Sequence, residues 1–103
     1  MNLKRIQILS DAIKDLDEGR TFYEQQECHA GDYFWDSLLS DIESLVIFAG
    51  VHSKKYGYYR MLSKRFPYAI YYDVNGDVVS IVAVLPMRRD PAWVKTKMSQ
   101  KSK

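Results

Sequence analysis

The hydrophobic residues of this chain change their spacing near its middle. Up to Gly50 they recur every three or four residues, as on one face of a helix, whereas from Tyr58 onward they alternate, as on one face of a strand. Helices followed by strands are typical of an α+β domain, in which helices cover one face of an antiparallel sheet. The 103 residues suffice for one such domain. We place it at residues 1–98 and expect residues 99–103 to form a frayed basic tail.

The first half of the chain predicts one strand and two helices. Residues 3–9 are rich in Ile and Leu with polar residues between them, which favours a short strand. Ser10 stands where a helix N-cap belongs, and the periodicity predicts an amphipathic helix over residues 11–27. A turn at residues 29–32 leads to a second helix, which we expect to end at Gly50 and whose apolar stripe is Phe34, Leu38, Ile42, Leu45 and Ala49.

The second half predicts three antiparallel strands at residues 58–65, 67–74 and 78–85. Asn-Gly is the strongest short hairpin signal, so Asn75 and Gly76 are expected to form a two-residue turn. This register places one face of the sheet under the helices: Phe66, Tyr68, Ile70, Tyr72, Val79, Ile81 and Leu85. The opposite face is partly apolar, so it is either covered or a binding surface: Ala69, Tyr71, Asp73, Val78, Ser80, Val82 and Val84.

A short C-terminal helix is predicted after the last strand. Asp90 is its expected cap and Pro91 its first residue, because proline suits the first helical position. We expect this helix to end near Met98.

Charge is divided unequally along the chain. Residues 1–50 carry four basic and ten acidic side chains, a net charge of −6, whereas residues 51–103 carry eleven basic and three acidic ones, a net charge of +8. Without the four lysines from Lys95 onward the second half still has a net charge of +4. Such a division favours an anionic partner such as RNA, DNA or an acidic protein segment, although acidic helices and a lysine-rich tail would also produce it.

Several kinds of site find no support in the sequence. Cys28 is the single cysteine, which indicates a reduced, cytosolic protein, and its place near a helix end predicts an inert thiol. His29 and His52 match no metal-ligand spacing, so we expect no metal or other cofactor and solvated histidines. No apolar run is long enough to span a membrane. The acidic residues Asp15, Asp17 and Glu18 are expected on an exposed helix face.

The candidate functional residues are basic and aromatic. Arg60, Lys64 and Arg65 lie on or after the first strand of the meander, and Arg88, Arg89 and Trp93 follow its last strand. Arg60 and Arg88 are predicted to converge as a phosphate clamp, because planar guanidinium groups suit phosphate oxygens. The aromatic residues that could stack on bases are Tyr58, Tyr59, Tyr71 and Trp93. Alternatively, the arginines pair with helix carboxylates and the tyrosines pack in the core.

Several segments together resemble the RelE/ParE toxin superfamily. They are Phe22–Glu24, Gly31–Phe34, Gly57–Tyr72 with its Arg-Phe-Pro-Tyr string, and Val82–Pro91 with its Arg-Arg-Asp-Pro string. The resemblance implies a β-α-α-β-β-β fold and the toxin of a type II toxin–antitoxin, plasmid-stabilisation-type system. It also implies a small cognate antitoxin as a partner, and a homodimer or a toxin–antitoxin hetero-oligomer.

The two branches of this superfamily imply different activities. RelE-like toxins cleave messenger RNA on the ribosome, and the residues expected for that reaction are replaced here by Ala69, Pro86 and Trp93, while Arg88 and Arg60 remain. ParE-like toxins inhibit DNA gyrase by binding it, which requires no catalytic residues. The resemblance therefore favours a ParE-like gyrase inhibitor. The alternatives are a ribosome-dependent endonuclease that uses Arg60, Arg88 and Lys64, and an inactive relative that binds only its antitoxin.

Overall fold

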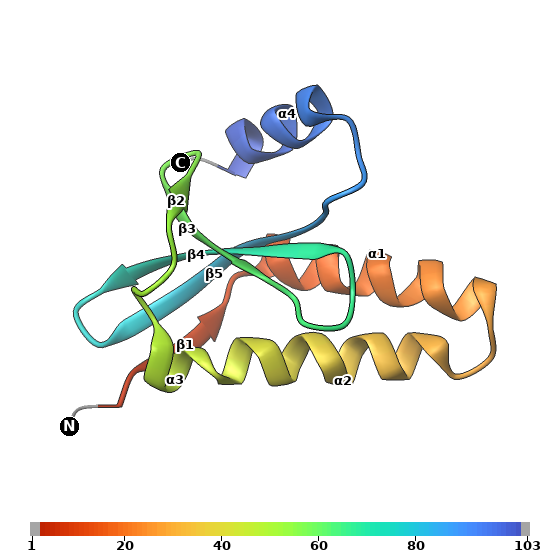
Figure 1. Cartoon of the computed structure of the whole chain (residues 1–103), viewed down its shortest axis with the longest axis horizontal. Coiled ribbons are helices and arrows are strands. Elements are labelled where there is room, and N and C mark those ends of the chain that lie inside the picture. The colour runs from red at the N-terminus through yellow and green to blue at the C-terminus, as the bar shows by residue number, and fades with distance from the viewer. Residues whose placement is uncertain (1–2, 102–103) are drawn as a thin grey trace.

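A five-stranded sheet lies between a long helix hairpin and a single C-terminal helix (Figure 1). The computed structural model describes residues 3–101. In chain order the elements are β1 (Arg5–Ile8), α1 (Ser10–Gln26), α2 (Ala30–Glu43), α3 (Leu45–Phe48), β2 (Lys54–Lys55), β3 (Tyr58–Leu62), β4 (Tyr68–Asn75), β5 (Val78–Pro86) and α4 (Pro91–Lys101). The predicted α+β class and element order are confirmed.

The sheet is mixed rather than wholly antiparallel. Its strand order is β1-β5-β4-β3-β2. Strand β1 pairs in parallel with β5, from Arg5 opposite Val78 to Ile8 opposite Ile81, while all other pairs are antiparallel. After β1 the chain passes through the helix hairpin and strands β2 to β4 before β5 returns to lie beside β1. The expected antiparallel sheet is thus correct for the meander and wrong for the first strand.

The helices differ from the predicted ones at their ends. Helix α1 begins at Ser10 and its cap is Leu9, which provides no side-chain hydrogen bond, so Ser10 is not the N-cap. The predicted second helix is interrupted at Ser44, whose hydroxyl donates to the carbonyl of Asp41 at 2.6 Å. The short helix α3 follows this interruption. Gly50 then has a left-handed φ of 96°, as expected for a residue that ends a helical segment.

Two glycines allow α1 and α2 to approach each other closely. A Cβ atom on Gly19 would lie 2.4 Å from Cζ of Phe34, whose side chain is fully buried and has no room to move. A Cβ on Gly31 would lie 2.7 Å from the backbone oxygen of Arg20. Glycine costs a helix about 1 kcal/mol relative to alanine, and here it permits the packing of the hairpin.

The β4–β5 hairpin has a different register from the predicted one. Asn75 is the last residue of β4 and pairs with Val78, so Gly76 and Asp77 form the turn. Gly76 supplies the left-handed φ of 63°. A bulge between Tyr71 and Tyr72 adds one further residue to β5.

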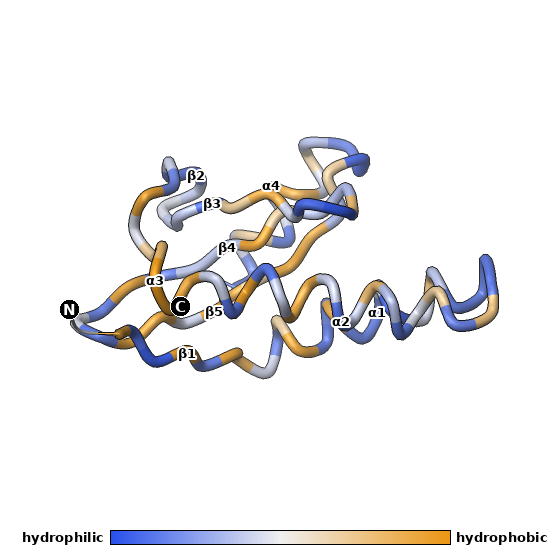
Figure 2. The backbone as a smooth tube through the Cα atoms, turned by 60° about the horizontal axis from the view of Figure 1, so that its bottom comes forward, coloured by the Kyte–Doolittle hydropathy of each residue, from blue (hydrophilic) through white to orange (hydrophobic). Residues whose placement is uncertain are grey.

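The bulge decides which residues of β5 face the helix hairpin. Ile81 and Val84 both lie in the core under α1 and α2, while Val82, Ala83 and Leu85 lie on the opposite face. The prediction of Leu85 under the hairpin and Val84 opposite is therefore wrong, because the extra residue reverses the alternation. The main core consists of Ala12, Leu16, Phe34, Leu38, Ile42, Leu45, Met61, Tyr68, Ile70, Tyr72, Val79, Ile81 and Val84. Figure 2 shows the matching alternation of hydrophobic and hydrophilic segments along α1 and α2.

Helix α4 covers the second face of the sheet. Its residues Val94 and Met98 pack against Ala69, Tyr71 and other residues of that face. The Asp90 carboxylate accepts the backbone N–H of Ala92 at 2.9 Å, which confirms Asp90 as the cap.

The C-terminal helix is longer than predicted. It continues past Met98 to Lys101, so residues 99–101 are helical instead of a frayed tail. Lys101 binds α1, as described below, and this contact fixes the last turn. Residues 102–103 of the predicted tail lie outside the described residues.

Candidate functional site

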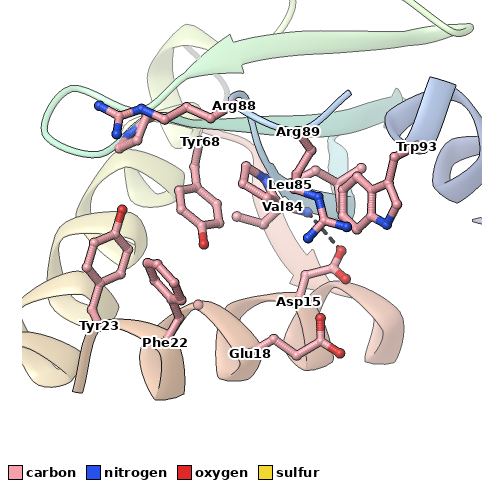
Figure 3. Close-up of a pocket in the computed structure, with 13 residues that line it drawn as sticks. Asp15, Glu18, Phe22, Tyr23, Tyr68, Val84, Leu85, Arg88, Arg89 and Trp93 are labelled. Atoms are coloured by element: carbon pink, nitrogen blue, oxygen red, sulfur yellow. Dashed lines mark hydrogen bonds between the residues drawn. The ribbon is translucent and has the colours of Figure 1, made fainter. Parts of the chain in front are cut away.

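A cavity of about 310 Å³ opens where the end of β5 meets α1 and the first turn of α4 (Figure 3). Helix α1 contributes one wall, the β4–β5 end of the sheet forms the floor, and the segment from Arg88 to Trp93 borders the opening. The lining residues are Asp15, Glu18, Gly19, Phe22, Tyr23, Pro67, Tyr68, Val84, Leu85, Pro86, Arg88, Arg89 and Trp93.

Asp15 is buried at the inner end of this cavity. Strand β1 ends at Ile8, so beyond Ile81 strand β5 is paired only with β4 and has no strand on its other side. On that side Asp15 Oδ2 accepts the Val84 N–H at 3.0 Å. The same oxygen lies 2.9 Å from Nζ of Lys101. Burial raises the pKa of the Asp15 carboxyl, and its bonds to Lys101 and Val84 lower it to a smaller extent. The prediction that Asp15 belongs to an exposed acidic face is wrong.

Two tyrosines line the cavity within an aromatic cluster. Tyr23 stacks on Phe34 with ring centroids 5.2 Å apart and contacts Phe66 edge-on at 4.8 Å. Tyr68 packs edge-on against Phe34 at 4.9 Å. Burial, together with neighbouring acidic groups, raises the pKa of Tyr68 to about 12, and burial also raises the pKa of Tyr23. Both hydroxyls therefore stay protonated near neutral pH.

Arg88, Arg89 and Trp93, which the sequence singled out, all line the cavity, Arg88 on one side and Arg89 with Trp93 on the other. Figure 3 shows Arg88 toward Tyr23 and Tyr68, and Arg89 beside Trp93. The Arg89 guanidinium lies 4.1 Å from the Trp93 ring centroid, and Lys97 Nζ approaches the same ring at 5.7 Å. Both arginines are exposed, and among residues 3–101 no carboxylate forms an ion pair with either one.

The other three predicted cations lie outside this cavity. Arg60 is on β3 and lines a smaller cavity under α4, which it shares with Arg89 but not with Arg88. Lys64 and Arg65 are exposed in the turn between β3 and β4, where the Lys64 backbone N–H donates to the Asp41 carboxylate at 3.3 Å. The predicted convergence of Arg60 and Arg88 in one clamp is not seen, and Arg89 is the basic residue that lines both cavities.

The aromatic residues proposed to stack on bases are mostly engaged within the fold. Tyr71 is 2% exposed beneath α4, and Tyr58 packs beside it. Tyr59 stacks on Tyr72 with centroids 5.2 Å apart. The Trp93 side chain is half-buried, and Arg89 and Lys97 approach its ring.

The two histidines have different surroundings. Nδ1 of His52 lies 2.6 Å from the Tyr72 hydroxyl, and burial lowers the pKa of its imidazole. The expectation of a solvated bystander is therefore wrong for His52. His29 is exposed in the turn between α1 and α2, with a left-handed φ of 71°.

The residue that sequence reasoning missed is Asp15. Ala12, Leu16 and Gly19 are buried on the α1 face that contacts the sheet, and Asp15 stands three residues after Ala12 and four before Gly19. This helical spacing places Asp15 on the same face of α1 as the buried residues, and it could have predicted the burial of the carboxylate.

The acidic and phenolic side chains that line the cavity are Asp15, Glu18, Tyr23 and Tyr68. No histidine lines the cavity, Tyr23 and Tyr68 have raised pKa values, and Asp15 is tied to Lys101 and Val84. Within residues 3–101 no group of three or more His, Cys, Asp or Glu side chains is arranged to hold a metal ion. In the same range no helix has the length and hydrophobicity needed to cross a membrane.

Comparison with known families identifies the fold's relatives. A family model described as the ParE toxin of the type II toxin–antitoxin system parDE matches residues 6–91. The chain belongs to the ParE toxin family. A solved structure described as the chromosomal ParDE toxin–antitoxin system from P. aeruginosa matches with a TM-score of 0.70 and 15% sequence identity, over 85% of this chain and all of that one. No curated protein sequence matches. The RelE/ParE resemblance is thereby confirmed as ParE-like.

Proposed function

We propose that this ParE-family toxin arrests bacterial growth by binding an essential enzyme, DNA gyrase, and that a cognate antitoxin neutralises it. The observation that supports this most strongly is the cavity at the end of β5. It combines a largely apolar lining, with the Asp15 carboxylate at its inner end, and the exposed side chains of Arg88 and Arg89 at its border. An apolar recess bordered by free arginines and a tryptophan has the composition of a protein-binding hot spot.

Binding without catalysis agrees with the titration of the lining groups. Cleavage of an RNA phosphodiester requires a base for the 2′-hydroxyl and an acid for the leaving oxygen, each with a pKa near the working pH. Tyr68 has a pKa of about 12, and the Asp15 carboxylate already accepts two hydrogen bonds. We therefore expect the side chains that line the cavity to provide a charged and apolar surface for a partner rather than to transfer protons.

The antitoxin is expected to cover apolar surface that the isolated toxin exposes. Phe22 and Tyr33, at the α1–α2 end near this cavity, are 52% and 55% exposed. Large exposed aromatic side chains beside a cavity are typical of a surface that a partner protein covers. Coexpression of the toxin with the open reading frame beside its gene tests this part: restored growth and a copurified complex are expected.

The target is tested by induction of the chain in bacteria that carry both a DNA-damage reporter and a translation reporter. Gyrase inhibition predicts growth arrest with the damage signal rising while translation continues. Purified toxin should also inhibit supercoiling by gyrase in vitro. Early collapse of translation with cut transcripts would instead indicate a ribosome-dependent endonuclease, and absence of arrest with folded protein present would indicate an inactive relative.

Arg88→Ala tests the cavity itself. The variant should fold normally, because the side chain is exposed, and should require about tenfold more protein for the same inhibition of supercoiling, as for loss of an interface arginine. Arg65→Ala is the matched control, since Arg65 is also an exposed arginine but lies outside the cavity. Full potency of folded Arg88→Ala would exclude this residue from the interface.

A further inference from the structure

A second, smaller cavity of about 90 Å³ lies under the first turn of α4, on the sheet face opposite the helix hairpin. Three basic side chains from separate segments line it: Lys55 of β2, Arg60 of β3 and Arg89 after β5. Tyr56, Tyr71 and Met87 contribute to its walls. Its lining contains no Asp or Glu, so the cavity concentrates positive charge without internal compensation.

Two of the three basic groups of this cavity contact aromatic rings, which do not neutralise their positive charge. Lys55 Nζ lies 5.5 Å from the Tyr56 ring centroid, and the Arg89 guanidinium lies 4.1 Å from that of Trp93. Asp90 is next in sequence, but its carboxylate accepts the Ala92 N–H and caps α4. Among residues 3–101 none of the three cations forms an ion pair.

Arg60 has a donor that no atom of the described chain satisfies. Its Nε is shielded from solvent and has no hydrogen-bond partner. A buried donor without an acceptor is unfavourable, and buried polar groups in native proteins are nearly always paired. The backbone N–H of the same residue is satisfied, because it donates to the Ser53 carbonyl at 2.9 Å. The missing hydrogen bond is therefore that of the guanidinium Nε–H.

We propose that this cavity binds the carboxylate of an Asp or Glu side chain from an acidic segment of a partner protein. A guanidinium group binds a carboxylate through two parallel N–H donors, and a carboxylate entering the cavity would supply the missing acceptor once the Arg60 side chain turns toward it. The small volume favours a terminal group on a side chain. A phosphodiester carries a sugar on each side and requires a groove open at both ends.

This carboxylate site is distinct from the cavity to which the proposed function refers, and its test does not depend on toxicity. The full chain, labelled with ¹⁵N, is titrated with an eight-residue polyglutamate peptide while the side-chain Nε–H signal of Arg60 is followed by NMR. Saturable movement of that signal is expected, with no movement of the Arg65 Nε–H signal. A polyglutamine peptide of the same length should move neither.

Two variants distinguish the paired N–H donors of the Arg60 guanidinium from its positive charge alone. Arg60→Lys retains the charge but loses the paired donors, so affinity for polyglutamate should fall about tenfold. Arg65→Lys, at an exposed arginine outside the cavity, should change it less than about twofold. If Arg60→Lys fails to fold, the wild-type titration with its two arginine signals decides the question alone.

Three results would overturn the proposal. An unmoved Arg60 signal at saturating peptide would show that the cavity takes no carboxylate. Equal loss of affinity in both variants would indicate attraction to the basic surface as a whole. Stronger movement of the signal by an eight-nucleotide oligothymidylate than by polyglutamate would assign the site to nucleic-acid phosphate.

Discussion

The two faces of the sheet are covered in different ways. Under α1 and α2, thirteen buried residues form one core in which large aromatic rings contact one another. On the α4 side a smaller core has seven buried residues, two of them in α4 itself and several of them small, and this single helix covers it. The first face is assembled from long neighbouring elements, whereas the second depends on a terminal helix whose last turn is held by Lys101 and Asp15.

The two cavities lie on different sides of the sheet, and both reach the segment that leads into α4. The larger one opens between α1 and the start of α4, and the smaller one lies beneath the first turn of α4. Arg89 borders both. The two faces therefore differ in their recesses: the larger cavity, on the hairpin side, contains the Asp15 carboxylate, whereas the smaller one, on the α4 side, is lined by basic side chains without a carboxylate.

Tyr72→Ala should have the largest effect on stability. The Tyr72 ring is fully buried in the main core and stacks on Tyr59, and its hydroxyl accepts the Gly50 N–H at 3.0 Å. Truncation should lower the free energy of unfolding by about 3–5 kcal/mol, measured by urea denaturation. Tyr72→Phe, which keeps the ring, should cost only about 1 kcal/mol. A loss below about 1 kcal/mol for the alanine variant would contradict the central place of this residue in the core.

Met98→Ala should have an intermediate effect. Met98 is 2% exposed and packs from α4 onto the sheet, but it stands near the end of a terminal helix that can adjust to a smaller side chain. We expect a loss of about 2 kcal/mol and faster amide exchange confined to α4. Ser99→Ala, at an exposed neighbour, is the control and should be nearly neutral. If Met98→Ala destabilised the protein as much as Tyr72→Ala, the two faces would be equally important.

The smallest expected effect is a pH dependence of the free energy of unfolding that arises from Asp15, whose contact with Lys101 joins α1 to α4. Because burial raises the pKa of the Asp15 carboxyl above its ordinary value of 3.8, the folded protein retains this proton to higher pH than the unfolded chain does. Between those two pKa values the folded state binds more protons, so the contribution of Asp15 to stability falls as pH rises. Asp15→Asn should remove this fall, whereas Asp17→Asn, at an exposed residue, should preserve it.

Urea denaturation of wild type and both variants at several pH values from 3.5 upward measures this contribution. The opposite sign, with Asp15 stabilising the fold increasingly as pH rises, would show that the ion pair with Lys101 outweighs burial.

The α+β class, the helix hairpin and the Asp90 cap followed local patterns, since hydrophobic period and capping are properties of neighbouring residues. The predicted cap at Ser10 and the unbroken second helix did not. The positions of Arg88, Arg89 and Trp93 at one strand end followed from their closeness in sequence. The hairpin register was less accessible, because Asn-Gly suggests a turn, while the side-chain packing on both faces selects Gly76 and Asp77 for it.

Contacts between residues far apart in the chain could not be predicted from local patterns. Those patterns account for the main helices and strands and for the excess of basic side chains in the second half. The parallel pairing of β1 with β5, the bulge that reverses Val84 and Leu85, and the burial of Asp15 beside Lys101 all needed the folded chain. The physical reason is that such contacts depend on which backbone groups remain unpaired after the sheet forms. At Val84 that requirement brought a carboxylate into the interior.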